Sequence, residues 1–475
     1  MAAPCAKPPV LYRPRDPQAS DLWRLIDQHF DSFQQVYDER YQAKYGYWRP
    51  IIEQSVTAYL KCGDLHAGFA RVRCPDCKHE MFVAFSCKQR CTCPSCHQKR
   101  TLLTAMHVAE DVCFPVAHRP VVLTIPKRLR VHTRFDRKLL GELASCAWRC
   151  LKAEACRLLN RDEVVPGMIG AIQTHGELLH WHPHIHVLIT CGAFTPEGDF
   201  LELPQFDVDR LLDVWQDAVF ELYLAKEKIE PEVVENMRGW EHSGFSVDQS
   251  VFLPAGDQAG IERLIQYMTR CPFSLSRLVK VSDTGQIVYQ AEKQACRAFP
   301  DPKGDGTQAG VKRNFQILPP LDFLAEFTQH IPAKGSHLIR YYGWYSNKSR
   351  GMRKKAEAAT SEEPANEEAT TSRSSQAWAM LIKRVYEVDP LSCPQCGGQM
   401  KVVSFIEPPQ SDVIEEVLKH CGLWQASSPR GPPGLDGLVL ELDAAYSASS
   451  IDSSDQADES QELTYVAIDT FLENF

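Results

Sequence analysis

Two closely spaced cysteine pairs constrain the fold of this chain more than any other feature of its sequence. Cys74 and Cys77 form a C-P-D-C turn, and Cys93 and Cys96 form a C-P-S-C turn after fifteen intervening residues. Each turn can present two sulfur atoms to one ion, and this spacing is within the range of tetrahedral four-thiolate zinc sites. We therefore expect these four cysteines to bind one structural zinc ion in a module that spans residues 61–105.

Nearby residues offer further metal ligands. Cys62 and Cys87 could bind a second ion, with Cys91, His66 and His79 close to them in the sequence. The alternative is that these cysteines pack as small apolar residues.

Another C-P-x-C turn lies near the C-terminal end of the chain. Cys393 and Cys396 form the sequence C-P-Q-C-G-G, and their two thiolates need two more ligands to complete a zinc site. The nearest downstream candidates are His420 and Cys421.

The compartment decides whether eighteen cysteines form disulfides or bind metal. No stretch of the chain approaches the ~18 consecutive apolar residues of a membrane-spanning helix. The first seventeen residues also lack the apolar centre of a signal peptide. We therefore expect a cytoplasmic protein with no membrane partner, whose reduced thiols favour metal binding.

The net charge of −9 conceals a difference between two parts of the chain. Residues 356–475 contain 21 acidic and 6 basic residues, whereas residues 1–355 contain 40 acidic and 46 basic residues. The larger part is therefore mildly basic, which is compatible with a nucleic-acid partner.

The hydrophobic pattern changes along the chain and predicts both helices and strands. Apolar and aromatic residues at three- and four-residue spacing predict helices in residues 20–60. From residue 119 onward, β-rich runs, including residues 244–254, are interrupted by helical segments around 136–159 and 206–226, which indicates an α+β or α/β domain. We divide the chain into a helical arm (1–60), the zinc module (61–105), the α+β domain (115–300), a helical and basic-aromatic region (301–355), a disordered linker poor in apolar residues (356–376), a small C-terminal module (377–425) and an acidic tail (426–475).

A histidine pair at the start of an apolar run is a candidate metal-binding site. Because alternate side chains of a strand share a face, His184 and His186 point together, while Ile185 and Val187 point to the other face. Two imidazoles on one face provide half of a divalent-metal site. An isolated His-x-His pair is more often a surface feature, but the preceding proline, the apolar strand and a polar neighbouring strand favour metal binding here.

The preceding strand can supply a third ligand. Residues 171–176 can pair with the histidine strand as an antiparallel hairpin. If His175 lies opposite His184, then Gln173 faces His186 and offers an amide oxygen. Two imidazoles and an amide leave coordination positions open, which suits a metal that polarises and holds a phosphodiester oxygen.

Tyr267 is the candidate nucleophile. It lies in a predicted helix with Arg263 four residues before it and Arg270 three residues after it, so the three side chains are expected on one face. Two guanidinium groups beside a phenol stabilise the phenolate and can hold the phosphate that it attacks. The alternative is a packed tyrosine with two solvated arginines, and the histidine pair favours the catalytic interpretation.

Two segments combine basic with aromatic residues, a composition that favours single-stranded DNA. Cations neutralise phosphates, and aromatic rings stack on unpaired bases by ~1–3 kcal/mol per base. Residues 337–345 could equally form an aromatic edge of the core, whereas residues 348–355 favour DNA binding. The predicted DNA-contact residues are Lys127, Arg128, Arg130, Arg340, Tyr341, Trp344, Lys348, Arg350 and Arg353.

Several independent motifs occur in a characteristic order. They are the paired C-x-x-C turns, Q-T-H-G, H-P-H-I-H, Q-Y-M-T-R-C-P-F-S, H-L-I-R-Y-Y-G-W-Y-S-N and D-P-L-S-C-P-Q-C-G-G. In this order, from about residue 20 to about residue 424, they resemble the insertion-sequence-91-like rolling-circle transposases. These are relatives of the HUH endonucleases, which are named for a histidine, a bulky apolar residue and a second histidine.

The resemblance implies a fold and a mechanism. The fold is an HUH-type nuclease domain with a central antiparallel sheet flanked by helices. The mechanism is metal-dependent nicking of one DNA strand by a tyrosine, which gives a 5′-phosphotyrosyl link and a free 3′-hydroxyl. His184 and His186 match the family's metal-binding pair, and Tyr267 matches its nucleophile. Many members carry a second tyrosine after three intervening residues, where this chain has Cys271, so it resembles the one-tyrosine branch.

The resemblance also implies cofactors and partners. Mg or Mn is expected at the catalytic site and zinc at the cysteine site. The expected partner is the single-stranded end of a bacterial mobile element, handled at the nucleoid. Because the sequence contains no G-x4-G-K-[ST] phosphate-binding loop, strand separation would come from a host helicase or from DNA that is already single-stranded.

Other protein classes remain open at this point. A zinc-containing DNA-binding regulator would use the histidine pair structurally and would form no covalent adduct. A metal-dependent nuclease that activates water would cut DNA without becoming attached to it. A transposase with an acidic-triad, two-metal site is disfavoured, because no carboxylate cluster stands beside the histidines and the tyrosine.

Overall fold

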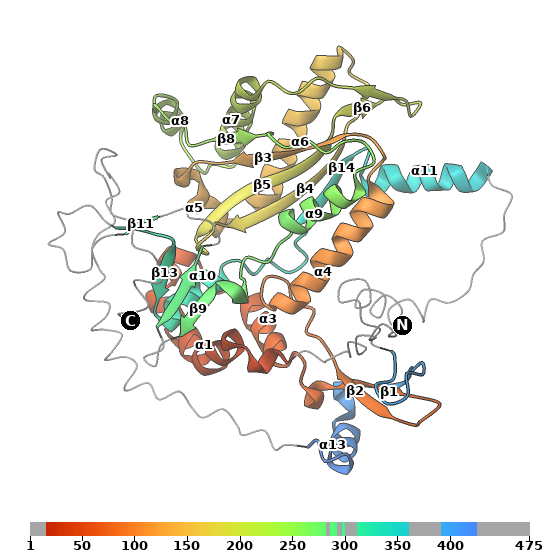
Figure 1. Ribbon diagram of the computed structural model, residues 1–475. Coiled ribbons are helices and arrows are strands. Elements are labelled where there is room, and N and C mark those ends of the chain that lie inside the picture. The colour runs from red at the N-terminus through yellow and green to blue at the C-terminus, as the bar shows by residue number, and fades with distance from the viewer. Residues whose placement is uncertain (1–15, 282–285, 292–296, 300–310, 361–390, 425–475) are drawn as a thin grey trace, which may run out of the picture. The chain divides into compact units, whose positions relative to one another are not determined.

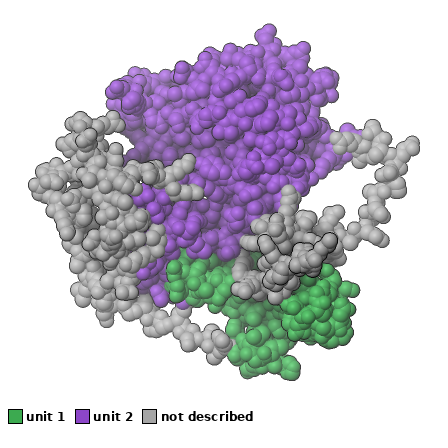
Figure 2. Space-filling view, in the orientation of Figure 1, with its two compact units in different colours: residues 1–24, 56–89, 357–430 green, residues 25–55, 90–356, 431–475 purple. Residues whose placement is uncertain are grey.

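The computed structural model describes residues 16–281, 286–291, 297–299, 311–360 and 391–424. The chain forms two compact units, which Figure 2 shows in different colours. Unit 1 comprises residues 1–24, 56–89 and 357–430, and unit 2 comprises residues 25–55, 90–356 and 431–475. The module predicted at residues 61–105 is therefore divided between the two units after Gln89.

A five-stranded antiparallel sheet forms the centre of unit 2 (Figure 1). Its spatial order is β14-β4-β5-β3-β8, and every neighbouring pair is antiparallel. The strands are β3 (His118–Thr124), β4 (Gly167–His175), β5 (Trp181–Thr190), β8 (Ser246–Asp248) and β14 (Ile339–Gly343). The prediction of an α+β fold with a central antiparallel sheet is confirmed.

The register between β4 and β5 corrects the predicted one. Gln173 lies opposite His184, and Ala171 lies opposite His186. An irregularity follows Gln173, so that His175 pairs with Trp181. The predicted register differs by two residues because β5 begins at Trp181, before the histidine pair, and leaves only a five-residue connection.

The two faces of the sheet are covered by different helices (Figure 1). Ile185, Val187 and Ile189 pack on one face, with apolar residues of four helices. Leu188 packs on the other face with helix α9 and the end of α4, and the alternation of strand side chains directs His184 and His186 to that same face. The covering helices are α5 (Lys127–Phe135), α6 (Lys138–Leu159), α7 (Val208–Ala225) and α8 (Pro231–Arg238) on the first face, and α4 (Pro94–His107) and α9 (Gln258–Met268) on the second.

The helices predicted in residues 20–60 are present as α1 (Asp21–Arg40) and α3 (Pro50–Leu60). In unit 2, the Tyr41 hydroxyl donates to Asp322 of α10 (Pro320–Thr328) at 2.7 Å, and Arg49 donates to the Ile331 carbonyl at 2.6 Å. The other elements with all their residues in unit 2 are α2 (Gln42–Tyr45), η3 (Val108–Val112), β6 (Gly192–Phe194), β7 (Phe200–Glu202), η4 (Leu275–Arg277), β9 (Leu278–Val281), β10 (Ile287–Gln290), β11 (Arg297–Phe299), β12 (Val311–Arg313) and β13 (Phe315–Leu318).

Unit 1 combines segments from both ends of the chain. Its three-stranded sheet has the order β15-β1-β2, and both pairs are antiparallel. Phe69 of β1 forms a small core with Ile406 of β15 and with Ile414 and Leu418 of α13. The C-terminal module predicted at residues 377–425 thus shares a sheet with the cysteine-containing N-terminal segment. The elements are η1 (Pro17–Ala19), η2 (Leu65–Ala67), β1 (Phe69–Arg73), β2 (Glu80–Ala84), β15 (Lys401–Ile406), η5 (Pro408–Gln410) and α13 (Ser411–His420).

The described residues include only the beginning of the predicted linker. Residues 356–360 continue the helix α11 (Asn347–Thr360), so the linker begins later than predicted, in keeping with the high helix propensity of alanine and glutamate. The rest of the linker and the tail at 426–475 lie outside the described residues. Within the described ranges, no helix has both the length and the apolar character to cross a membrane.

Candidate functional site

The histidine pair of β5 forms the centre of the candidate site. The Nε2 atoms of His184 and His186 lie 2.9 Å apart. The His184 Nδ1–H donates to the carbonyl oxygen of His182 at 2.7 Å, a bond that leaves the Nε2 lone pair of His184 free. Two such nitrogens that converge on one point can bind a single cation.

Burial keeps both imidazoles neutral. It lowers the pKa of His184 to about 4, with a smaller contribution from the positive charge of Arg270. Burial lowers the pKa of His186 to about 3, and His184 and Arg270 add to this effect. Because only a neutral imidazole can donate a lone pair to a metal, both residues are competent ligands at neutral pH.

Gln173 adds an oxygen to this donor set. It lies directly across from His184 in the sheet. Its amide nitrogen donates to the carbonyl oxygens of Tyr267 at 3.0 Å and Met268 at 2.8 Å. Its Oε1 atom is buried and has no hydrogen-bond partner among the described residues. A buried oxygen without a partner beside two neutral imidazoles fits a divalent cation that keeps open coordination positions.

Tyr267 lies beside the histidine pair, on the last turn of α9. Its ring centroid is 5.6 Å from that of His186, with an interplanar angle of 88°. Tyr267 is 46% exposed, so a large substrate can reach this residue. The Arg270 guanidinium lies over the tyrosine ring, 4.8 Å from its centroid. The predicted single helix face is corrected, because α9 ends at Met268 and Arg270 approaches Tyr267 from the segment that follows.

The second predicted arginine is placed differently. Arg263 is exposed on α9, one turn before Tyr267, and the contacts described for Tyr267 involve Arg270 and His186. Sequence analysis missed a residue that fixes Arg270. The carboxylate of Glu177 pairs with Arg270 at 3.2 Å and with Arg277 at 3.1 Å. Glu177 lies in the turn between β4 and β5, where a single carboxylate gives no sequence signal.

A cavity of about 220 Å³ borders the site. Gln173, His175 and Arg270 line its wall, together with Arg90, Arg100 and Thr101 from the segment that leads into and through α4. Its arginines and threonine suit an anionic or polar group. This cavity could not be predicted from the sequence, because its walls come from segments far apart in the chain.

The first group of predicted DNA-contact residues lies on α5. Lys127 and Arg128 are exposed there, and Arg128 donates to the Asn236 side chain at 3.2 Å. Arg130 is half-buried, and its Nε donates to the Ile125 carbonyl at 3.0 Å.

The second group lies on β14 and α11. Arg340 and Tyr341 belong to β14 and are partly buried. Trp344 stacks on Phe194 at 4.4 Å, and Arg353 lies over the Trp344 ring at 4.2 Å. Lys348 is exposed at the start of α11, and Arg350 lies over Tyr341 at 5.2 Å. The aromatic residues of this segment therefore contribute to packing, while the exposed cations of α11 remain available to a ligand.

The cysteines form two groups that differ from the predicted one. The ligand atoms of Cys62, Cys87, Cys93 and Cys96 all lie within 4.8 Å of one another, and so do those of Cys74, Cys77, Cys393 and Cys396. The prediction that Cys74 and Cys77 share an ion with Cys93 and Cys96 is therefore wrong. The spacing of a C-x-x-C turn shows which two sulfurs act together, but the fold decides which turns meet.

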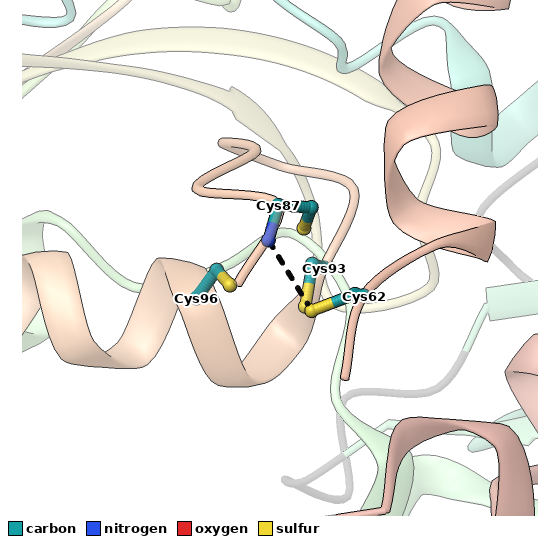
Figure 3. A group of neighbouring side chains, drawn as sticks. All are labelled: Cys62, Cys87, Cys93 and Cys96. Carbon is teal, nitrogen blue, oxygen red and sulfur yellow. Dashed lines mark hydrogen bonds between the residues drawn. The ribbon is translucent and has the colours of Figure 1, made fainter. Parts of the chain in front are cut away.

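The first group lies close to the start of α4 (Figure 3). Cys93 is the N-cap residue of α4, and Cys96 lies in its first turn, where the helix dipole favours thiolates. The Cys87 backbone N–H donates to the Cys62 sulfur at 3.4 Å. Four converging sulfurs fit a tetrahedral zinc ion. Cys91, considered with this group from the sequence, lies outside it, and burial raises the pKa of its thiol.

The second group joins the two C-P-x-C turns of unit 1. Cys74 and Cys396 have sulfurs 3.5 Å apart, as do Cys77 and Cys393. The downstream candidate Cys421 is exposed at the end of α13 and is not part of the group. The C-terminal turn therefore finds its partner cysteines near the beginning of the chain and not in the residues that follow it.

Comparison with known proteins identifies two domains in the chain. Residues 167–353, which contain the histidine pair and Tyr267, match the family described as "Putative transposase". Residues 32–125 match the family described as "Transposase zinc-binding domain", and all six N-terminal cysteines of the two groups fall in this range. Together these domains define a transposase with a zinc-binding domain.

Two relatives, each aligned over most of its own length, agree with this class. The "Transposase for insertion sequence element IS801" of Pseudomonas savastanoi pv. phaseolicola is 24% identical over 379 residues, which cover 75% of this chain and 85% of the relative. The "Putative transposase y4qJ" of Sinorhizobium fredii (strain NBRC 101917 / NGR234) is 23% identical over 358 residues, which cover 70% and 81%. No solved structure matches the chain significantly. Both matched domains and both relatives agree with the resemblance to the insertion-sequence-91-like transposases.

Proposed function

We propose that this transposase nicks and rejoins single-stranded DNA at the ends of an insertion sequence, with Tyr267 as the nucleophile. The proposal rests on the convergence of the His184 and His186 Nε2 atoms, 2.9 Å apart, beside the ring of Tyr267. Metal-assisted phosphoryl transfer to a protein side chain requires a cation site and a nucleophile close together. A DNA-binding regulator has no need of this arrangement.

His184, His186 and the Oε1 atom of Gln173 would hold the divalent cation, Mg²⁺ or Mn²⁺. When bound, such a cation polarises a phosphate oxygen and stabilises its negative charge. The protein supplies neutral imidazoles, one of them fixed in its tautomer by the His182 carbonyl. We expect zinc at the cysteine sites, because thiolate ligands favour zinc.

The bond exchange takes place at the phenol oxygen of Tyr267. This oxygen loses its proton to solvent and forms a bond to phosphorus, while the bond from phosphorus to the 3′-oxygen breaks. The leaving 3′-oxygen takes up a proton, so the products are a 5′-phosphotyrosyl link and a free 3′-hydroxyl. The energy of the broken phosphodiester is retained in the new one, so rejoining needs no ATP. Arg270, held over the ring, is positioned to neutralise the phosphate.

One tyrosine is available for this exchange. Cys271 is half-buried, and burial raises the pKa of its thiol to about 12, so it stays protonated and does not act as a second nucleophile. We therefore place this protein in the one-tyrosine branch of the HUH enzymes.

The surroundings of the site suit an unpaired strand. The cavity lined by Arg90, Arg100 and Thr101 borders Gln173 and Arg270, and it would take a nucleotide next to the scissile phosphate. The exposed cations of α5 and α11 would bind phosphates of the DNA backbone further from the scissile bond. Because the sequence has no phosphate-binding loop for ATP, a host helicase or an existing single strand would supply the substrate.

A covalent-adduct assay tests the proposal. Labelled single-stranded oligonucleotides from the element's ends are incubated with the protein and Mn²⁺ or Mg²⁺ and then run on a denaturing protein gel. We expect label on the protein, and we expect it to disappear in Tyr267→Phe, in His184→Ala/His186→Ala and in the presence of EDTA.

The other outcomes point to other functions. Cleavage without attachment of label would indicate a nuclease that activates water, and Tyr267→Phe would then retain activity. Binding without cleavage, across several end sequences and both metals, would indicate a regulator. Either result overturns the tyrosine mechanism.

A further inference from the structure

The two C-P-x-C turns of unit 1 share one backbone conformation. In the first turn, the Cys74 N–H donates to the carbonyl oxygen of His79 at 2.8 Å, and the Lys78 N–H donates back to that of Cys74 at 3.1 Å. Lys78 has a φ of 64°, in the left-handed region. The flanking residues Arg73 and Glu80 pair across the turn as β1 and β2.

The second turn repeats each of these features. The Cys393 N–H donates to the Gly398 carbonyl at 2.8 Å, and the Gly397 N–H donates to the Cys393 carbonyl at 2.9 Å. Gly397 has a φ of 73°, and Ser392 pairs with Gln399 across the turn. Two turns with equivalent bonds at equivalent positions present their sulfurs in the same way, as the two halves of a metal-binding ribbon do.

The four sulfurs are spaced as a tetrahedral zinc site requires. A zinc–sulfur bond of ~2.3 Å places neighbouring sulfurs of a tetrahedron roughly 3.8 Å apart. Here the Cys74–Cys396 and Cys77–Cys393 sulfur pairs are each 3.5 Å apart, and all four sulfurs lie within 4.8 Å of one another. Each close pair takes one sulfur from each turn, so neither turn completes the site alone.

Too few apolar residues are buried around the sulfurs to hold the two turns together without a metal ion. The buried residues of this cluster are Val72, Cys74, Cys393 and Met400. A core of this size contributes little stability, and small domains of this kind depend on disulfides or a structural metal. Strand β15 joins β1 through a register that shifts between Arg71 and Val72, so the sheet itself is irregular.

We propose that Cys74, Cys77, Cys393 and Cys396 bind a second structural zinc ion, in a ribbon assembled from both ends of the chain. Two of these ligands lie outside the matched zinc-binding domain at residues 32–125, and Cys74 and Cys396 are 322 positions apart. The zinc ion holds the C-terminal module to the N-terminal strand pair, and with the first cysteine group it gives two zinc ions per chain.

Metal stoichiometry tests the ligand set. The full-length protein, purified without added metal, is expected to contain two zinc ions, and Cys74→Ser/Cys77→Ser and Cys393→Ser/Cys396→Ser are each expected to contain one. Cys421→Ser, which removes an exposed cysteine of the same module, is the control and keeps two. One zinc ion in the wild type, two in the Cys393→Ser/Cys396→Ser variant, or iron in place of zinc would overturn the proposal.

A second measurement separates loss of the ligands from general misfolding. A protease site is inserted into the full-length chain between residues 361 and 390, and the protein is cut after folding. In size-exclusion chromatography, the C-terminal fragment is expected to co-elute with the remainder in zinc-containing buffer and to separate from it after chelation. All four cysteines are present in this protein, so the separation cannot result from a substitution. Separation of the fragment with zinc still bound at two ions per chain would contradict the proposed ribbon.

Discussion

Arg270 connects Tyr267, the proposed nucleophile, to the turn between β4 and β5. Its guanidinium lies over the Tyr267 ring and pairs with Glu177 at 3.2 Å. We expect Arg270→Ala to slow formation of the covalent adduct about 100-fold, the usual effect of removing one group that stabilises transition-state charge. Single-turnover kinetics at saturating metal would measure this, with Arg161→Ala, an exposed arginine of the turn before β4, as the control. An unchanged rate in Arg270→Ala would remove Arg270 from the catalytic machinery.

His118 makes the stability of unit 2 dependent on pH. The buried Tyr345 hydroxyl accepts from the Phe114 N–H at 3.1 Å, so its own proton is directed to the His118 Nε2, 2.7 Å away. This bond requires a neutral imidazole, and burial lowers the pKa of His118 to about 4. In the unfolded chain the pKa is near 6.5. Between pH 6.5 and pH 4 the unfolded chain therefore takes up a proton that the folded chain does not. The free energy of unfolding decreases as the pH is lowered through this range.

The size of this effect can be measured against a variant. Between pH 7 and pH 5, His118 is expected to reduce the free energy of unfolding by about 2 kcal/mol. Urea unfolding of the wild type and of His118→Gln at both pH values would isolate this contribution, because glutamine can accept the tyrosine hydroxyl without titrating. Equal losses in the two proteins would show that folding does not lower the pKa of His118.

For single residues, the sequence predicted the kind of chemistry better than it predicted which residues lie together. Alternation along a strand was enough to place His184 and His186 on one face, since that geometry is local. The opposite residue on β4 was not predictable, because the start of β5 at Trp181 sets the register. Cys393 and Cys396 could not be predicted as partners of Cys74 and Cys77, because they lie more than 300 positions away in the sequence.

Helix α9 depends on the sheet for the position of its last turn. The Gln173 amide donates to the carbonyls of Tyr267 and Met268, which lie at the C-terminal end of the helix, where the last carbonyls have no i+4 donor within the helix. In Gln173→Glu an oxygen ligand remains but both donors are lost. We expect this variant to keep divalent-metal binding and to form the adduct about tenfold more slowly, as loss of about 1 to 1.5 kcal/mol of positioning predicts.

Two comparisons make this test specific. Gln173→Met removes the oxygen as well and is expected to weaken metal binding, measured by calorimetry. Hydrogen exchange at residues 265–270 should accelerate in both Gln173 variants but not in Gln258→Met, an exposed position at the other end of α9. Unchanged exchange in both variants would mean that the sheet does not hold the helix end.

Long periodic elements were predicted well from the sequence, and short edge elements were not. The periodicity of residues 136–159 corresponds to α6, because one helix face packs on the sheet. The run at 244–254 forms a strand only at Ser246–Asp248, since β8 is an edge strand that pairs with three residues of β3. Val251 and Phe252, apolar in pattern, are half exposed instead.

At the scale of the whole molecule, the charge asymmetry predicts a salt-dependent effect on DNA binding. Residues 426–475 contain ten acidic residues and one basic residue, and residues 1–355 are mildly basic. If this tail competes with DNA for the basic part, its deletion should tighten binding of a single-stranded oligonucleotide at low salt. The difference should vanish at high salt, where both attractions are screened. Fluorescence anisotropy over a salt series would measure it.

A matched variant separates charge from length. Replacing the acidic residues of 426–475 by Asn and Gln keeps the chain length and should act like the deletion. Equal affinity of all three proteins at every salt concentration would rule out competition by the tail.

The shared sheet of β1 and β15 has a consequence for the order of synthesis. Cys396 follows Cys74 by 322 residues, and ribosomes add about 5–20 residues per second, so roughly 15 to 65 seconds separate the two turns. During that interval, β1 has one open edge, and Cys74 and Cys77, which follow it, lack their two partner cysteines. A chain that terminates early never closes this sheet, so only a transposase translated through residue 406 can pair β15 with β1.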